Sequence, residues 1–237
     1  MLGDVRGHRK EYRRRRNRRE FSTVSLVGYT NAGKSSLLKA LSQAEVLVED
    51  KLFTTLDPKT RRIRLPGGRI VLFTDTVGFI DKLPHDLVAA FRATFEEIAE
   101  ADLILRIVDI SHPGAEAHIE AVERILSDLG VTSRKTLTVW NKIDRIEDME
   151  PPQDHVLRIS ALRGDGLDRL LERVETILNR DMEYGEFLLP YNDGYLLSAV
   201  HGKGNVDTEE YREGGIFIRA AVPPLLSKRL EPFRARS

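Results

Sequence analysis

One run of the sequence has the residue types and the spacing of a loop that binds nucleotide phosphates. It reads Gly28-Tyr29-Thr30-Asn31-Ala32-Gly33-Lys34-Ser35. The glycines let the backbone wrap around phosphate oxygens so that its N–H groups point inward. Lys34 can reach the β- and γ-phosphates, and Ser35 can coordinate Mg²⁺. We therefore predict that this run and Ser36 bind nucleotide, with Lys34 as a catalytic residue and Mg²⁺ as the cofactor.

A second segment, Asp75-Thr76-Val77-Gly78, supplies a carboxylate and a glycine after a predicted strand. Asp75 could hold a water molecule bound to Mg²⁺, and the backbone N–H of Gly78 could sense the γ-phosphate. An Asp-x-x-Gly sequence on its own is common and is usually just a turn. Because it follows the phosphate loop, we expect Asp75 at the metal and Gly78 at the reacting phosphate.

A third segment, Asn141-Lys142-Ile143-Asp144, has residues that can recognise guanine. Asp144 can accept hydrogen bonds from the ring N–H and the exocyclic amine of guanine, whereas adenine would leave the carboxylate unpaired. Such a mismatch discriminates by a factor of about 10⁴. Asn141 would position the loop and reach the base edge, and the stem of Lys142 would lie over the ring. Ser160-Ala161-Leu162 would supply a further loop that contacts the base.

Hydrophobic patterns place these segments at strand ends of an α/β fold. They predict strands at 23–27, 61–65, 69–74, 103–108, 136–140 and 156–159, and helices at 34–42, 85–100, 116–129 and 167–178. Strands that alternate with helices favour a mostly parallel sheet with helices on both faces. The turn at 66–68 adds one antiparallel neighbour. Ligands bind at the strand ends of such sheets.

The alternation of strands and helices stops after Asn179. Strands at 187–189 and 215–222, with a helix at 194–201, then predict a small α+β unit at the C-terminal end. The chain therefore has a large α/β part followed by a smaller part of a different class.

Length and composition limit the class of protein. The chain has 237 residues, of which 41% are hydrophobic and 31% charged, as is usual for a globular protein. It contains no cysteine, which excludes disulfides, thiolate zinc sites and cysteine nucleophiles. No apolar run approaches the roughly 18 residues of a membrane span. The N-terminal residues lack the apolar core of a secretory signal.

The net charge of zero, from 37 basic and 37 acidic side chains, conceals an asymmetry. Residues 1–20 carry nine basic and three acidic side chains, a charge of +6, so the other 217 residues carry −6. This basic arm suggests a polyanionic partner such as RNA, bound through its phosphates. A solvated linker helix is an equally good interpretation of the same residues.

Together the segments resemble the GTPase signature, and the residues between them resemble the HflX family of ribosome-associated GTPases. A phosphate-loop ATPase or kinase would lack the guanine-reading segment. The resemblance rests on Val24 to Ser35, on Leu52 to Pro58 with Thr60-Arg61-Arg62, and on Asp75 to Ile80 with Leu83-Pro84-His85 and Ala90-Phe91. It covers about residues 5–180 firmly and the C-terminal unit more loosely.

The resemblance implies a fold and a division into domains. We expect a phosphate-loop GTPase fold in a GTPase domain at 21–180. A basic linker segment at 1–20 would precede it, and a small α+β domain at 181–237 would follow. Proteins of this family usually have a further sizeable domain before the GTPase domain. We therefore expect this chain to be a fragment or a naturally short member.

The resemblance also implies roles for single residues. Thr55 would be the first-switch threonine that closes on Mg²⁺ and the γ-phosphate, with Thr54 as the alternative and a solvated loop hydroxyl as the simpler interpretation. Phe79 stands where many GTPases have a residue that orients the attacking water, so intrinsic hydrolysis should be slow. Asn31 matches a position that coordinates K⁺ in some related GTPases, although it could instead satisfy the loop backbone. His85 is expected to begin a helix rather than to act in catalysis.

These observations lead to two hypotheses of function. The first is an Mg²⁺-dependent GTPase that acts as a nucleotide switch on the large ribosomal subunit and its rRNA, in ribosome dissociation or recycling under stress. The second is an RNA-binding ribosome-assembly module that uses GTP mainly as a structural ligand. Regulation through a protein partner of the C-terminal unit is a third possibility. We expect GTP and GDP as ligands, a cytoplasmic location, and no association with DNA or integral association with a membrane.

Overall fold

The computed structural model describes residues 21–43, 60–76, 78, 97–128, 130–131, 135–146 and 156–235. The basic arm at 1–20, Thr54, Thr55, Phe79 and most of the helix expected at 85–100 lie outside the described residues. Contacts divide the chain into two compact units. One contains Thr23–Ile63 and Leu72–Ile177, and the other contains Arg64–Val71 and the residues from Leu178 on.

The large sheet has six strands in the order β2-β3-β1-β4-β5-β6. Their bounds are β1 (Ser22–Val27), β2 (Thr60–Arg64), β3 (Ile70–Asp75), β4 (Leu103–Asp109), β5 (Thr136–Asn141) and β6 (Val156–Arg158). β1 pairs with β4, β4 with β5 and β5 with β6, all in parallel. The expected mostly parallel sheet is therefore confirmed.

The hairpin of β2 and β3 differs slightly from the sequence expectation. Leu65 and Arg69 were expected inside the strands, but the N–H of Leu65 donates to the carbonyl of Arg69 across 2.8 Å and closes the turn. Both strands are therefore one residue further from the turn than the hydrophobic pattern suggests. At its other end β3 extends to Asp75, one residue beyond the expected Thr74.

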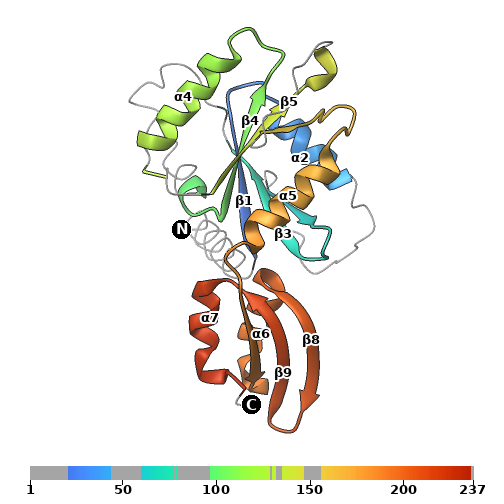
Figure 1. The fold of residues 1–237 in the computed structure, drawn as a ribbon, viewed down its shortest axis with the longest axis vertical. Helices are drawn as coiled ribbons and strands as arrows, with labels where there is room; N and C mark the ends of the chain where they lie inside the picture. Colours follow the sequence, from blue (N-terminus) through green and yellow to red (C-terminus); the bar gives the residue numbers. More distant parts are fainter. Residues whose placement is uncertain are drawn as a thin grey trace, which may run out of the picture. The chain divides into compact units, whose positions relative to one another are not determined.

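Helices cover both faces of the large sheet, as expected. Figure 1 shows α4 (Ala115–Asp128) on one side and α2 (Lys34–Gln43) and α5 (Leu167–Asn179) on the other. On the α4 side, Val122 and Leu126 of the helix pack against Val27 and Ile104 of the sheet. The burial of these apolar side chains holds β1 and β4 in the positions from which their ends reach the site.

The C-terminal residues form a three-stranded antiparallel sheet in the order β7-β9-β8, with two main helices. The bounds are β7 (Glu183–Leu189), α6 (Gly194–Lys203), β8 (Asn205–Arg212), β9 (Gly215–Val222) and α7 (Pro224–Leu230), and the short 3₁₀ turns are η2 (Tyr191–Asp193) and η3 (Glu231–Phe233). The sequence pattern indicated neither β8 nor α7.

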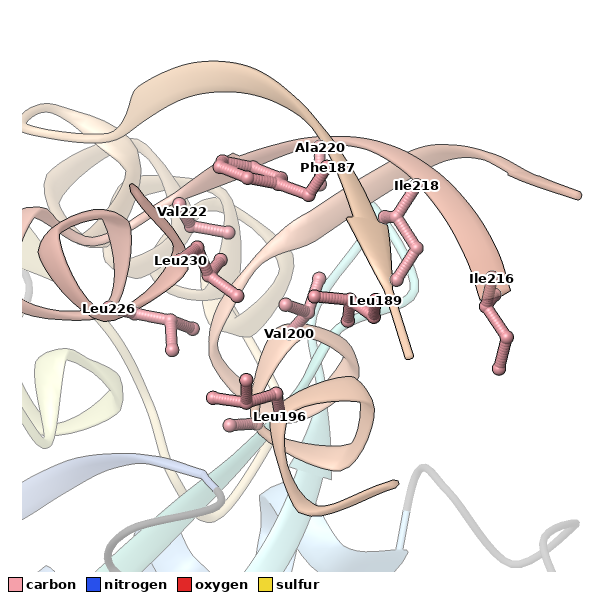
Figure 2. Close-up of a cluster of buried hydrophobic side chains, with 11 residues drawn as sticks. Phe187, Leu189, Leu196, Val200, Ile216, Ile218, Ala220, Val222, Leu226 and Leu230 are labelled. Atoms are coloured by element: carbon pink, nitrogen blue, oxygen red, sulfur yellow. The ribbon is translucent and has the colours of Figure 1, made fainter. Parts of the chain in front are cut away.

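One face of this small sheet is packed against its helices (Figure 2). Inward side chains of β7 and β9 meet apolar side chains of α6 and α7 in a single buried cluster: Phe187, Leu189, Ile216, Ile218, Ala220 and Val222 from the strands, and Leu196, Val200, Leu226 and Leu230 from the helices. This part of the chain thus has its own hydrophobic core. No described helix is both long enough and apolar enough to cross a membrane.

Candidate nucleotide site

Lys34 is the first residue of α2 and points back over the loop that precedes the helix. Its Nζ donates to the carbonyl oxygens of Gly28 and Tyr29, at 3.0 and 2.9 Å. Burial lowers the pKa of Lys34, and the nearby carboxylate of Asp75 partly offsets this effect. The ammonium group is thus held within the loop by two carbonyl oxygens, which phosphate oxygens could replace as acceptors.

The start of α2 gives the loop a second source of positive potential. The N–H of Leu37 donates to the carbonyl of Gly33 across 2.9 Å, so the helix begins at the end of the loop. The N–H groups of the first turn, which includes Ser35 and Ser36, have no partner within the helix and favour an anion. Asn31 is exposed in the loop with a φ of 60°, a left-handed conformation that asparagine tolerates.

Ser35 and Asp75, the two described metal-binding candidates, are in direct contact. The hydroxyl of Ser35 donates to Oδ2 of Asp75 across 2.5 Å, although 40 residues separate them. Oδ1 of Asp75 is buried and has no hydrogen-bond partner among the residues that the structure describes. Thr76 holds the end of β3 against β1, because its Oγ1 donates to the carbonyl of Leu26 across 2.6 Å. A hydroxyl and a buried, incompletely paired carboxylate suit a hard cation such as Mg²⁺.

Mg²⁺ at a nucleotide site usually has one or two carboxylate contacts plus waters and phosphates. The described residues include no group of three or more histidine, aspartate or glutamate side chains placed to hold a metal. The pair of Ser35 and Asp75 offers one hydroxyl and one carboxylate to such an ion.

Gly78 lies against the phosphate loop. A Cβ on this residue would be 2.9 Å from Cα of Thr30 and 3.2 Å from Nζ of Lys34. Real Cβ atoms do not approach backbone atoms so closely, so only glycine fits here without a shift of the loop. The structure thus brings Gly78 and Asp75 close to Lys34.

Asn141 connects the phosphate loop to the base-reading loops. Its side chain is 1% exposed, its Nδ2 donates to the carbonyl of Ala32 across 2.9 Å, and its Oδ1 accepts from the N–H of Ala161 across 3.0 Å. A Cβ on Gly33 would be only 2.2 Å from Asn141 Nδ2. The positioning role predicted for Asn141 therefore has a structural basis, since both ends of its amide bind the protein.

Asp144 lies in the short 3₁₀ turn η1 (Ile143–Arg145), next to the loop that follows β6. The buried hydroxyl of Ser160 donates to Oδ1 of Asp144 across 2.6 Å, and this hydrogen bond is the main reason that the pKa of Asp144 lies below its usual value. The carboxylate is therefore fixed and ionised. Leu162, in the same loop as Ser160, is 82% exposed.

Lys142 has a left-handed backbone conformation, with a φ of 67°, that is uncommon for a lysine. Its Nζ forms an ion pair with Asp109, which ends β4, at 2.5 Å. Burial opposes ionisation of Asp109, but hydrogen bonds from Lys142 and Ser111 outweigh it, so the pKa of Asp109 is lowered. Sequence reasoning missed Asp109, although its place at the end of a buried apolar run could have indicated it.

A ring stack beside the phosphate loop was also missed. Tyr29 and His118 of α4 stack with ring centroids 3.7 Å apart and an interplanar angle of 8°, and His112 lies 4.6 Å from His118. These rings, with Thr30 and Asn31, line a cavity of about 340 Å³. The sequence showed no metal or triad spacing for these histidines, and their meeting depends on the approach of α4 to the loop.

The fold and the paired phosphate-loop and guanine-reading segments define the class of GTP-binding α/β proteins. Residues 23–142 match the sequence pattern of the family described as 50S ribosome-binding GTPase, and the chain belongs to this family. The resemblance to HflX is also confirmed. The chain is 45% identical to the GTPase HflX of Caldanaerobacter subterraneus over 98% of its own length, and 37% identical to that of Escherichia coli over 97%.

The chain spans about half the length of the curated relatives it matches, 54% of the Caldanaerobacter protein and 56% of the Escherichia coli protein. Among solved structures it is similar to a GTP-binding protein from Sulfolobus solfataricus in complex with GDP. That likeness has a TM-score of 0.54 and 27% identity, and it covers 66% of this chain and 52% of the other.

Proposed function

We propose that this chain is an Mg²⁺-dependent GTPase that hydrolyses GTP to GDP and phosphate. The observation that carries the proposal is the cluster of Lys34, Ser35, Asp75 and Gly78, which places an ammonium group, a hydroxyl, a carboxylate and a glycine at one end of the sheet. Membership of the 50S ribosome-binding GTPase family supports it. The GTPase domain is assigned to 21–180 and the small α+β domain to 181–237.

The reaction is attack of water on the γ-phosphorus, with the leaving diphosphate opposite the attacking oxygen. Lys34 neutralises charge on the β- and γ-phosphate oxygens, and the backbone N–H of Gly78 contacts the γ-phosphate. When bound, Mg²⁺ supplies further charge neutralisation at these oxygens, held by Ser35 and Thr55 and, through water, by Asp75. Loss of the γ-phosphate releases the segments of Thr55 and Gly78, which turns hydrolysis into a change of shape.

Specificity for guanine is assigned to the loop of Asp144. Ser160 fixes Oδ1 of this carboxylate at 2.6 Å and keeps it ionised, so it can accept from the two N–H groups that guanine presents. Asn141, Lys142 and Ala161 hold the surrounding backbone. Leu162 is exposed beside this loop and is assigned to the edge of the base pocket.

We further propose that the nucleotide state controls binding to the large ribosomal subunit in the cytoplasm, in ribosome dissociation or recycling under stress. The family membership and the likeness to GTPase HflX proteins support this assignment. Because a phenyl ring at position 79 cannot orient the attacking water, intrinsic hydrolysis is slow and the subunit is the activator. K⁺ bound at Asn31 is an additional source of activation.

The test is GTP hydrolysis by the purified chain with and without 50S subunits, in matched Na⁺ and K⁺ buffers. We expect a slow basal rate, a marked increase with 50S subunits, and loss of both in the Lys34→Ala variant. An unchanged rate with 50S subunits would contradict the ribosome assignment. If the chain binds GTP tightly but does not hydrolyse it even with subunits present, the alternative hypothesis is favoured. In that hypothesis the chain is an RNA-binding assembly module that uses GTP mainly as a structural ligand.

A further inference from the structure

β8 is an edge strand of the small sheet as the structure describes it. It lies at the end of the order β7-β9-β8, and among the described residues it pairs only with β9. Figure 1 shows it as the outermost strand of the small sheet. Edge strands present backbone N–H and C=O groups that another extended segment can bind. A register irregularity between Val206 and Thr208 leaves 208–212 as the regular part of this edge.

Two exposed tyrosines, Tyr211 on β8 and Tyr191 of η2, are held by hydrogen bonds to residues of β8. Tyr191 is 55% exposed, and its hydroxyl donates to the carbonyl of Arg212 across 2.9 Å. Tyr211 is 72% exposed and is hydrogen-bonded to the carboxylate of Glu209, which also pairs with His201 of α6 at 2.8 Å. Tyrosines that are already held lose little entropy when a partner covers them, and tyrosine is enriched at the centres of interfaces.

The charge around the edge is negative. Residues 205–215 contain four acidic side chains and one basic side chain, a net charge of −3. Arg212, the basic one, is neutralised by Glu210 at 2.6 Å and lies 3.7 Å over the ring of Phe217. Glu209 is likewise paired with His201, so Asp207 and Glu213 are the exposed acids of this segment for which the described residues form no ion pair. Such a surface repels the phosphates of RNA and attracts lysine and arginine side chains.

A second copy of the chain is a poor occupant for the same reason. Two acidic edges placed side by side would repel each other, which is how natural sheets prevent pairing between identical edges. An acidic edge does not repel a basic strand. The charge thus selects a foreign partner over self-association.

We propose that 208–212 of β8 bind a basic, extended segment of a partner protein as an added strand. Backbone pairing supplies affinity, Tyr191 and Tyr211 cover the aliphatic stems of the partner's lysine or arginine side chains, and the exposed carboxylate of Glu213 attracts a charged end. This surface is independent of the nucleotide site and goes beyond the proposed GTPase function.

The test uses the full chain and a fluorescent ten-residue peptide of alternating lysine and valine, with binding followed by anisotropy. Tyr211→Ala and Glu213→Lys should each weaken binding by about tenfold. Matched controls are Tyr195→Ala, an exposed tyrosine on α6, and Glu120→Lys, an exposed acid on α4, which should change the affinity by less than about twofold. GDP affinity should be the same in all variants, so a failure here is separate from a failure of the GTPase proposal.

Two further probes decide the mode of binding. The same peptide with alternate N-methylated residues keeps its charges but cannot pair along a strand, and it should lose binding. Equal binding of the N-methylated peptide would overturn strand addition. Tighter binding of a twelve-nucleotide single-stranded RNA than of the peptide would overturn the choice of a basic protein partner, and so would loss of binding in both control variants.

Discussion

The side-chain amide of Asn141 donates to the backbone carbonyl of Ala32 across 2.9 Å, which joins the guanine-reading loop to the phosphate loop. The two residues are 109 positions apart in the chain. Since the oxygen of the same amide accepts from Ala161, one buried side chain holds three loops together. The parts of the site that would bind base and phosphate are therefore positioned jointly rather than separately.

Replacement of Asn141 by alanine should damage both stability and nucleotide binding. It leaves the carbonyl of Ala32 and the N–H of Ala161 without their partners, and each such buried group costs about 1 to 3 kcal/mol. We expect the free energy of unfolding, measured with urea, to fall by about 2 to 4 kcal/mol. GTP and GDP binding should be weakened to the same extent as each other. Asn192→Ala, at an exposed asparagine, is the control and should stay within about 0.5 kcal/mol.

Gly33→Ala should weaken nucleotide binding more than its backbone strain alone explains. Gly33 has a φ of 97°, and a Cβ there would be 2.2 Å from Asn141 Nδ2, so the substitution displaces the link between the loops. Gly130→Ala is the matched control, because Gly130 has a φ of 67° but open space around a Cβ. In both variants the free energy of unfolding should fall by about 1 to 2 kcal/mol, because alanine is strained in the left-handed conformation. Only Gly33→Ala should also lose GDP affinity, measured by calorimetry. Equal GDP affinities would contradict the role of the contact.

Much of the large sheet could be predicted from the sequence, because apolar runs and glycine-rich turns are local signals. The mostly parallel pairing and the helices on both faces follow from the alternation of strands and helices, and the structure confirms them. The link from Asn141 to Ala32 and the ion pair of Lys142 with Asp109 could not be predicted. The first joins residues that are 109 positions apart and the second joins residues that are 33 positions apart. Only the packed sheet determines which strand ends meet.

Asp144→Asn should change the base preference of the site from guanine to xanthine. The carboxamide oxygen can still accept from Ser160, as Oδ1 of Asp144 does at 2.6 Å, so the loop should keep its shape. The new NH₂ group would face the donors of guanine but could donate to the carbonyl that xanthine has in place of the amine. We expect GTP affinity to fall by about 10² or more and XTP affinity to rise. Asp128→Asn on α4 should leave both affinities unchanged.

The pH dependence of guanine binding should depend on the hydrogen bond from Ser160 to Asp144. Because its hydrogen bond lowers the pKa of Asp144, the ionised carboxylate contributes fully above the ordinary carboxyl pKa of about 4 and is lost only as the pH falls through the lower folded-state value. Ser160→Ala should return that pKa toward its ordinary value, so GDP affinity should begin to fall at a higher pH. The check is to measure GDP affinity as the pH is lowered, with Ser227→Ala as a control at another buried serine. Superimposable curves for Ser160→Ala and the parent chain would exclude this role of Ser160.

Asp75→Asn should separate metal dependence from nucleotide binding. The substitution keeps an oxygen for the hydroxyl of Ser35 but removes the charge of a carboxylate whose Oδ1 is buried without a partner in the described part of the chain. We expect the Mg²⁺ concentration needed for half-maximal GTP hydrolysis to rise about 10- to 100-fold. GDP binding in EDTA should be the same for variant and parent, because no metal is then involved. A large difference in EDTA would mean that Asp75 is needed for the fold instead.

The small C-terminal part was less accessible to sequence reasoning. β8 reads Asn-Val-Asp-Thr-Glu-Glu-Tyr-Arg, which has no alternating apolar face, and it forms because it pairs with β9 along its length. α7 has seven residues, too few to show a helical period, although Pro224 at its first position is a helix-start signal that could have indicated it. β8 is thus held by its pairing with β9, and α7 by the burial of Leu226 and Leu230 in the core of the small sheet.

Trp140 gives the unmodified chain an optical probe of its own site. It is the only tryptophan in the sequence. It lies on β5, directly before Asn141, which ends the strand, and Lys142, which follows it. The guanidinium of Arg158 on β6 lies 5.7 Å from its ring centroid. Any movement of the base-reading loop against β6 changes the surroundings of this single indole. Its emission can therefore time nucleotide exchange without labels, including while a ribosomal subunit is bound, if the subunit's own fluorescence is subtracted.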